Sequence, residues 1–232
     1  MVVRLYDLCG RDRDLRFSPY CWRARFALAH KGVVPETVPT PFGAIREIEG
    51  GAFRTVPVLV DNGERIGDSF EIALHLEATR PGAPTLFGSE GIVAAARFLE
   101  GWAVAHLHPV IGRIIIMPIH DLIDVADQAY FRQSREARYG VTLEAFTTGA
   151  DAEREALARA LAPLRHALAR HEWLGGPSPL FTDYIVLGSL MWLYTIHGEL
   201  PLAPDDPVLN WFERGLDLHG GLARQATSAG AR

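Results

Sequence analysis

The sequence of 232 residues is poor in cysteine and carries no excess of positive charge. Its two cysteines, Cys9 and Cys21, are too few for a disulfide scaffold and fit a reducing compartment, so we expect a cytoplasmic protein. The formal net charge is −5, whereas proteins that bind nucleic acids normally present a basic face. We therefore expect no nucleic-acid partner.

Long apolar runs are also lacking. The most apolar stretch, residues 110–119, is shorter than the roughly 20 residues that span a bilayer, and it carries Arg113 and Pro118. The first ten residues contain no basic segment followed by a long apolar stretch, so no signal peptide is expected. Hydrophobic residues make up 48% of the chain and charged residues 22%, the balance of a soluble globular protein with a buried core. We expect no membrane partner.

Strand and helix signals alternate over the first eighty residues. Strands are predicted at 2–8 and 33–38, and a helix at 19–31 that Gly32 ends. Residues 56–69 predict a hairpin, because Asn-Gly at 62–63 supplies the two positive-φ residues of a tight turn. A further helix is predicted at 69–80. This order of elements is typical of a thioredoxin-like fold.

The segment 81–89 is rich in proline and glycine and predicts a linker, and everything beyond it has a helical pattern. One apolar stripe runs from Ile92 to Met117, with a kink expected at Pro109 and Gly112. A second stripe runs over 157–168, residues 182–196 predict a central buried helix, and residues 207–218 a last one. The sequence predicts an α/β thioredoxin-like N-terminal domain at 1–81, a linker at 82–89 and an all-α helical-bundle domain at 90–232.

Ser18 and Pro19 stand immediately before the first predicted helix. Proline suits the first helical position and serine the N-cap, so Ser18 is expected to cap this helix. The same hydroxyl, together with the helix N-terminus, could also hold the thiolate of a ligand. A cysteine at position 18 would complete a Cys-x-x-Cys pair with Cys21, but serine stands there, so the usual two-thiol exchange is excluded. Cys21 is better explained as a small buried hydrophobic residue than as a redox-active thiol. The case for redox chemistry at Cys9 is weaker still.

Other groups of chemically active residues give weaker signals. His106 and His108 stand two apart on a predicted helix and point to different sides, so no metal site is expected. Several apolar and aromatic residues of the helical part could line an aromatic pocket or simply belong to the core: Trp102, Met117, Tyr130, Phe131, Tyr139 and Trp192.

Four stretches, in order and spacing, carry a resemblance to a known family: SPYCWRARFALAHKG, TVPVLVDNG, GDSFEIALHLE and WLGGPSPLFTDYIVLGSLMW. Together they resemble the cytosolic glutathione transferase superfamily with a serine in the catalytic position. Within it, the likeness is closest to the bacterial glutathione-dependent β-etherases, and it covers nearly the whole chain. The resemblance implies the glutathione transferase architecture, glutathione as the cofactor, and a homodimer.

The resemblance also implies roles for particular residues. Ser18 matches the hydroxyl that supports the glutathione thiolate. The implied glutathione-binding residues are Val56 and Pro57, a cis pair at the cysteinyl unit; Asp68 and Ser69 at the γ-glutamyl group; and Phe42 and Arg54 at the glycyl end. We expect Ser69 to cap the helix that follows and Asp68 to face the ammonium group. One departure is Leu180, which stands three residues before Asp183 where the superfamily usually has a small polar cap.

The expected function is therefore attack of the glutathione thiolate on a small hydrophobic or aromatic electrophile, with cleavage of β-aryl ethers among the reactions considered. Two alternatives stay open at this point. One is a glutathione-dependent thiol-disulfide oxidoreductase that uses Cys21, and the other is a non-catalytic protein that binds glutathione or another ligand.

Overall fold

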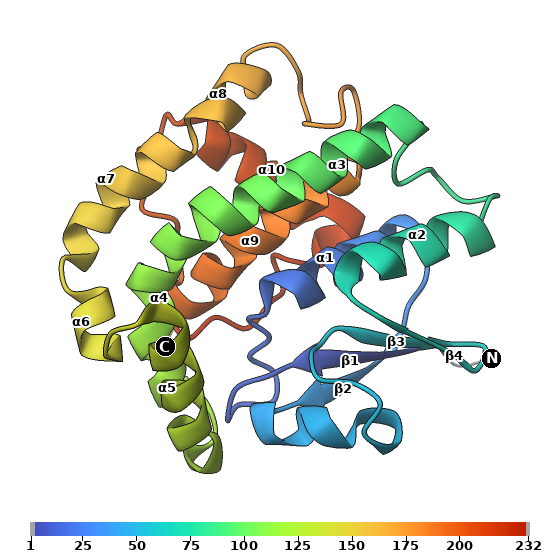
Figure 1. Cartoon of the computed structure of the whole chain (residues 1–232). Coiled ribbons are helices and arrows are strands. Elements are labelled where there is room, and N and C mark those ends of the chain that lie inside the picture. Colours follow the sequence, from blue (N-terminus) through green and yellow to red (C-terminus); the bar gives the residue numbers. More distant parts are fainter. Residues whose placement is uncertain (1–2, 231–232) are drawn as a thin grey trace.

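The protein combines a four-stranded sheet with two helices on one face and a larger helical part (Figure 1). The structure, a computed structural model, describes residues 3–230, without the side chains of residues 150 and 151. The strands are β1 (Arg4–Leu8), β2 (Glu36–Thr40), β3 (Val58–Asp61) and β4 (Glu64–Gly67), in the order β2-β1-β3-β4. β1 is parallel to β2 and antiparallel to β3, and β4 is antiparallel to β3.

The hairpin and its register agree with the sequence pattern. Asn62 and Gly63 both have positive φ, at 53° and 88°, and join β3 to β4 with Asp61 opposite Glu64. Leu5 at the centre of the sheet pairs with Leu59, and both side chains are fully buried. The second strand is displaced from the predicted 33–38 to 36–40 because residues of β1 pair in parallel register with Glu36 and those that follow.

Helices α1 (Pro19–His30) and α2 (Ser69–Thr79) lie between the sheet and the helical part, while the 3₁₀ helix η1 (Phe42–Gly50) lies on the other side of the sheet (Figure 1). Ser18 caps α1 and Pro19 occupies its first turn, as predicted. Trp22 and Phe26 of α1 are fully buried.

The helical part is built around one buried helix. Its elements are α3 (Glu90–Trp102), the π-helical turn η2 (Ala103–Leu107), α4 (His108–Leu122), α5 (Val125–Tyr139), α6 (Leu143–Thr147), α7 (Ala150–Ala160), α8 (Ala162–Leu168), α9 (Phe181–His197) and α10 (Pro207–Gly221). α9 is central, as predicted, and packs closely on α1. At Gly188 a Cβ atom would lie 2.5 Å from the Pro19 carbonyl oxygen, so only glycine permits this approach.

Two helical stripes are less regular than the sequence predicts. The irregular turn of the first stripe is η2, which ends two residues before Pro109, and α4 continues regularly through Gly112. Proline has no N–H to donate to the carbonyl one turn earlier, so the helical hydrogen-bond pattern is disturbed near Pro109. Glycine keeps its N–H, and the pattern is undisturbed at Gly112. The second stripe divides into α7 and α8 at Leu161.

The continuous run Glu90–Leu122 is long and apolar enough to cross a membrane by length and composition alone, unlike the ten-residue stretch at 110–119 considered above. A single such helix is weak evidence, since a core helix of a soluble protein meets the same criterion. Leu107, Ile111 and Ile115 of this run are fully buried in the protein core. The run therefore contributes to the packed helical part.

The start of α9 is held by Asp183 in place of a polar residue at position 180. Its carboxylate accepts hydrogen bonds from the backbone N–H groups of Leu174 and Gly175, each at 2.8 Å, and of Leu180 at 3.1 Å. The indole of Trp211 donates a fourth at 3.1 Å. Burial raises the pKa of Asp183, and these hydrogen bonds oppose the shift. The departure at Leu180 thus leaves the fold intact.

Candidate functional site

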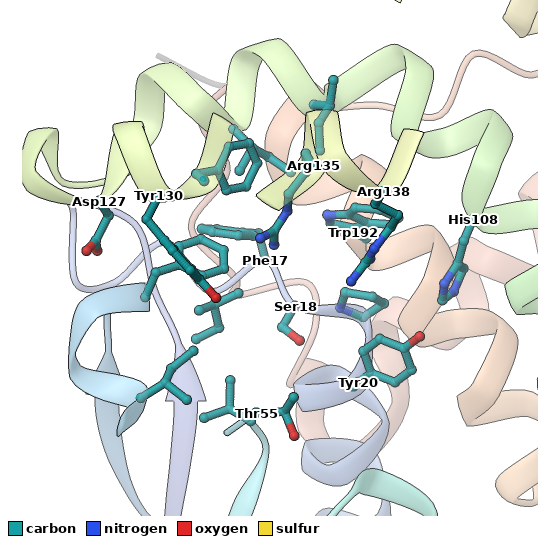
Figure 2. Close-up of a pocket in the computed structure, with 18 of the residues that line it drawn as sticks. Phe17, Ser18, Tyr20, Thr55, His108, Asp127, Tyr130, Arg135, Arg138 and Trp192 are labelled. Atoms are coloured by element: carbon teal, nitrogen blue, oxygen red, sulfur yellow. The ribbon is translucent and has the colours of Figure 1, made fainter. Parts of the chain in front are cut away.

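A cavity of about 760 Å³ lies where the sheet part meets α4 and α5 (Figure 2). Segments far apart in the sequence contribute to its wall: the loop from β1 into α1, η1, residues 54–56, α4, α5 and one residue of α9. Its size is in the range of small-molecule sites, which is about 300–1,000 Å³. The lining is mainly aromatic and apolar with a few arginines and hydroxyl groups.

Ser18 lies in the wall of this cavity at the N-terminus of α1 (Figure 2). Its Oγ accepts a hydrogen bond from the backbone N–H of Cys21 at 3.3 Å, and the residue is 4% exposed. A hydroxyl has two acceptor lone pairs and one proton to donate. Capping uses an acceptor position, so the proton stays available for an anion in the cavity. Capping and ligand binding are therefore compatible at Ser18.

Three of the predicted glutathione-binding residues line the same cavity as Ser18: Phe42, Arg54 and Val56. Pro57 is buried outside the lining, and its peptide bond with Val56 is cis. The Nη1 atom of Arg54 donates to the carbonyl oxygens of Gly51 at 2.7 Å and Phe53 at 3.0 Å. The structure thus brings Ser18 together with a residue of η1 and with residues of the loop before β3.

Asp68 and Ser69 lie at the N-terminus of α2, outside the residues that line the cavity. The expectation that Ser69 caps α2 is wrong: Asp68 is the cap, and its Oδ1 accepts from the N–H groups of Phe70 at 2.8 Å and Glu71 at 3.2 Å. Asp68 has the non-helical backbone that a cap needs, with φ of 70°, whereas Ser69 is already in the helix. The Ser69 hydroxyl is buried and, among the described residues, has no hydrogen-bond partner.

Cys21 is fully buried beneath the start of α1. Its sulfur accepts a hydrogen bond from the Leu8 N–H at 3.5 Å. Burial, reinforced by the charge of Asp7, raises the pKa of Cys21 well above its usual value. Burial also raises the pKa of the Cys9 thiol. Both thiols are therefore protonated and enclosed, which disfavours the oxidoreductase alternative.

Sequence reasoning missed several residues of the cavity wall, among them Tyr20, Thr55, His108, Arg135 and Arg138. The two arginines are three residues apart in the stretch FRQSREARY, within the predicted helical region. This spacing indicates that they share one helix face, but it does not indicate that the face lines a cavity.

His108 is held among aromatic and hydroxyl groups. Its Nε2 lies 3.0 Å from Ser189 Oγ, and its ring contacts Tyr20 and Trp192 edge-on, each with centroids 5.6 Å apart. Burial lowers its pKa to about 3, and the charge of Arg23 acts in the same direction. His108 is therefore a neutral imidazole at physiological pH.

The aromatic wall is partly as proposed from the sequence. Four of the six residues line the cavity, namely Tyr130, Phe131, Tyr139 and Trp192, whereas Trp102 and Met117 do not. Phe42 joins the sheet side to the helical side, with its ring 5.4 Å from Phe131 and 6.4 Å from Phe17. Among the described residues, no group of three or more His, Cys, Asp or Glu side chains could hold a metal ion.

Known proteins share both halves of this architecture. Residues 14–84 match the glutathione S-transferase N-terminal domain, and residues 94–201 match the C-terminal domain. Glutathione transferase GSTFuA3 from Phanerochaete chrysosporium is 25% identical, with a TM-score of 0.74 over 95% of this chain and 92% of that one. Similar folds occur in a Ceriporiopsis subvermispora glutathione S-transferase solved with glutathione (22%, TM-score 0.73, 95% and 93% covered) and in one from Xanthobacter autotrophicus (22%, 0.59, 94% and 94%). Since the two domain matches together span most of its length, the chain belongs to the glutathione S-transferase family.

Proposed function

We propose that this protein is a glutathione transferase that uses Ser18 to stabilise the glutathione thiolate for attack on an aromatic electrophile. One observation carries the proposal: the Ser18 hydroxyl caps α1 and lines an aromatic cavity at the junction of the two parts. We further propose residues 1–81 as the glutathione-binding domain, 82–89 as the linker and 90–232 as the acceptor side.

The residues present fit glutathione. Val56 lines the same cavity as Ser18, and its backbone can pair with the cysteinyl unit. Arg54 and Phe42 suit the glycyl end, since the partners of the Arg54 side chain among residues 3–230 are backbone carbonyl oxygens. At α2, the unpaired Ser69 hydroxyl can donate to the γ-glutamyl carboxylate. The capping bonds to Asp68 involve Oδ1 alone, so Oδ2 can accept from the ammonium group.

The free energy of thiolate stabilisation that the proposal requires lies within the range of known interactions. A free thiol has a pKa of about 8.5, and ionising it near pH 7 requires roughly two units, or about 2.7 kcal/mol. A hydrogen bond to a charged group contributes about 1.5–3 kcal/mol and a helix N-terminus roughly 0.3–2 kcal/mol. The Ser18 hydroxyl and the N-terminus of α1 together supply what is needed, whereas each alone falls near the limit.

The residues on the acceptor side orient the electrophile and exclude water from it. When bound, glutathione supplies the nucleophilic sulfur, which forms a bond to carbon as the leaving group departs with its electron pair. The aromatic wall stacks on the acceptor and excludes water, so the chain contributes orientation beside a stabilised anion. With a β-aryl ether the leaving group is a phenolate, and the likeness to bacterial β-etherases supports including this reaction in the proposal.

A cytoplasmic homodimer completes the proposal. The two cysteines are free and buried, as suits a reducing compartment. Phe98 of α3 is 77% exposed, an apolar side chain that a second copy of the chain could cover. Light scattering of the wild type and of Phe98→Ser tests this: a wild-type mass of one chain would contradict the dimer.

Calorimetry and turnover test the function. We expect the protein to bind glutathione with measurable heat and to conjugate it to 1-chloro-2,4-dinitrobenzene, with release of chloride. Chromatography of reactions with α-keto β-aryl ethers tests for release of the phenol. Absence of glutathione binding would contradict the whole proposal. Binding without turnover of any electrophile would favour the non-catalytic alternative.

A further inference from the structure

Arg135 and Arg138 extend from α5 toward the part of the cavity that contains Ser18 (Figure 2). Because they are three residues apart on one helix, they lie on the same face. Arg135 has one polar contact in the described part of the chain, a hydrogen bond from Nη1 to Ser134 Oγ at 2.8 Å. The side chain of Arg138, which lies in α5, has neither a hydrogen bond nor an ion pair within residues 3–230. Neither guanidinium is therefore neutralised by a carboxylate.

A third arginine of the same helix behaves differently. Arg132 lies outside the cavity lining and pairs with Glu136 at 3.0 Å and with Glu144 at 2.8 Å. Burying a charge without such a partner is costly, and Arg135 is partly buried. Among the three arginines of α5, the two that line the cavity are thus the ones without a carboxylate partner in the described part of the chain.

Arg135 is held in a fixed orientation by aromatic rings. Its guanidinium carbon lies 4.3 Å from the ring centroid of Phe131 and 5.0 Å from that of Phe42. Burial lowers the pKa of Arg135, and the charge of Arg138 acts in the same direction. Two like charges therefore lie near each other, one on the partly buried Arg135 and one on the exposed Arg138, and a bound anion would relieve their repulsion.

Glutathione does not account for this pair of charges. In the proposed binding mode its glycyl carboxylate meets Arg54 and its γ-glutamyl group meets α2, both in the sheet part. Asp127 is the one carboxylate among the lining residues, and it forms no ion pair within the described chain. Figure 2 places it at the far end of the group of labelled residues from Arg138. The charges on α5 thus face the side of the cavity left for the acceptor.

We propose that Arg135 and Arg138 bind a carboxylate carried by the aromatic acceptor substrate. This inference rests on the proposed function and narrows its substrate class to aromatic electrophiles with an acidic group. A guanidinium donates two parallel hydrogen bonds to a carboxylate, and the half-exposed ring of Tyr130 in the cavity wall is available to stack on the arene. Arg135 and Arg138 act here as specificity-determining residues.

The first test measures binding without chemistry. Calorimetry on the protein saturated with glutathione compares 3,5-dinitrobenzoate with 3,5-dinitrobenzamide, which share a ring and differ in charge. We expect the carboxylate to bind at least about tenfold more tightly, the factor for one charge-assisted hydrogen bond. Arg135→Gln and Arg138→Gln should each remove most of this preference and leave the amide unaffected. Arg132→Gln, on the same helix but outside the cavity, is the matched control and should retain it.

The second test measures turnover with 4-chloro-3,5-dinitrobenzoate and its amide. The thiolate sulfur bonds to the carbon that bears chlorine, the carbon–chlorine bond breaks, chloride leaves with the electron pair, and the thiol proton goes to buffer. We expect KM for the benzoate to rise about tenfold in either glutamine variant, with kcat and the values for the amide little changed. Arg138→Gln changes an exposed residue, so it keeps the test meaningful if Arg135→Gln folds poorly.

The outcomes separate the two proposals. Equal binding of acid and amide by the wild type, or a preference that survives in both variants, would overturn the carboxylate site. A raised pKa of the bound glutathione thiol in the arginine variants would also overturn it, because the arginines would then serve the thiolate. Selective binding of the benzoate without turnover of either chlorinated probe would support the site and contradict the proposed function.

Discussion

Arg23 Nη1 donates to Glu100 Oε1 at 2.8 Å and joins α1 to α3 across the junction of the two parts. Arg23 is fully buried, and its guanidinium lies over the ring of Tyr20 with 4.7 Å to the centroid. Burial lowers the pKa of Arg23, and the charge of Glu100 opposes this. Since Tyr20 lines the cavity two residues after Ser18, the ion pair helps to fix the start of α1.

Removing Glu100 should therefore be costly. Glu100→Ala leaves a buried guanidinium without its counter-charge, and we expect the free energy of unfolding to fall by about 3 kcal/mol, the lower end for breaking a buried pair. Urea denaturation followed by circular dichroism measures the change.

A second carboxylate of the same neighbourhood supplies the control. Glu71 pairs with Arg97, which also contacts Glu100, but both members of this pair are about half exposed. Glu71→Ala should cost less than about 1 kcal/mol, as for other surface pairs. Equal losses in the two variants would show that burial of Arg23 does not set the cost.

Ser18→Ala should raise the pKa of the glutathione thiol in the complex by about one to two units, because a charge-assisted hydrogen bond of roughly 1.5–3 kcal/mol is lost. Turnover near pH 6.5 should fall about ten- to hundredfold, while glutathione affinity changes little. Ultraviolet titration of the bound thiolate and calorimetry measure the two effects.

The same substitution removes a helix cap, which contributes about 1 kcal/mol to stability. Thr142→Ala is a suitable comparison, since Thr142 Oγ1 caps α6 by accepting from Ala145 N–H at 3.2 Å and does not line the cavity. It should lower stability without altering the thiol titration. A thiolate titration that Ser18→Ala leaves unchanged would rule out the assigned role.

Cys21 should be dispensable for activity. Its thiol is fully buried, and burial raises its pKa, so the native protein should form no mixed disulfide with oxidised glutathione at pH 7. Intact-mass spectrometry after the challenge measures this. Cys21→Ala should keep conjugation activity within about twofold and lower stability by roughly 1 kcal/mol through the small cavity it leaves. Rapid glutathionylation of the native protein would restore the oxidoreductase alternative.

Local sequence signals predicted local structure well. The Asn62–Gly63 turn and the cap at Ser18 depend on residues within a few positions of each other, and both are confirmed. The sequence predicts the wrong cap for α2 because Asp68 and Ser69 are both good caps, and the choice between them depends on where the preceding strand ends. Position 180 shows the limit of a motif, since Asp183 satisfies the start of α9 without a polar neighbour there.

The cavity could be predicted only in part. Ser18 and Val56 stand in short stretches that carry the family resemblance, and Phe42 and Arg54 stand in the segment before β3, where the family binds the glycyl end. Arg135 and Arg138 follow Ser18 by more than a hundred residues, and their spacing specifies one helix face without saying what that face meets. Which face of α5 closes the cavity depends on the packing of α5 against η1 and α4, which no local pattern encodes.

His108 should make the protein less stable in mild acid. Its pKa is lowered to about 3 in the native state by burial and by Arg23, against a usual value of 6.5. Between these values the unfolded chain binds a proton that the native protein does not. Stability due to neutral His108 is therefore fully present above pH 6.5 and declines as pH falls toward 3, by up to about 1.4 kcal/mol per pH unit.

His108→Gln keeps a polar partner for Ser189 and removes the titration. Between pH 7.5 and pH 5 it should lose about 2 kcal/mol less stability than the wild type, which urea unfolding at the two pH values measures. His171→Gln, at an exposed position after α8, should follow the wild type. Parallel losses in the wild type and His108→Gln would mean that His108 takes up its proton in the native protein. In that case the protonated imidazole of His108 would be a further positive charge in the wall of the acceptor side.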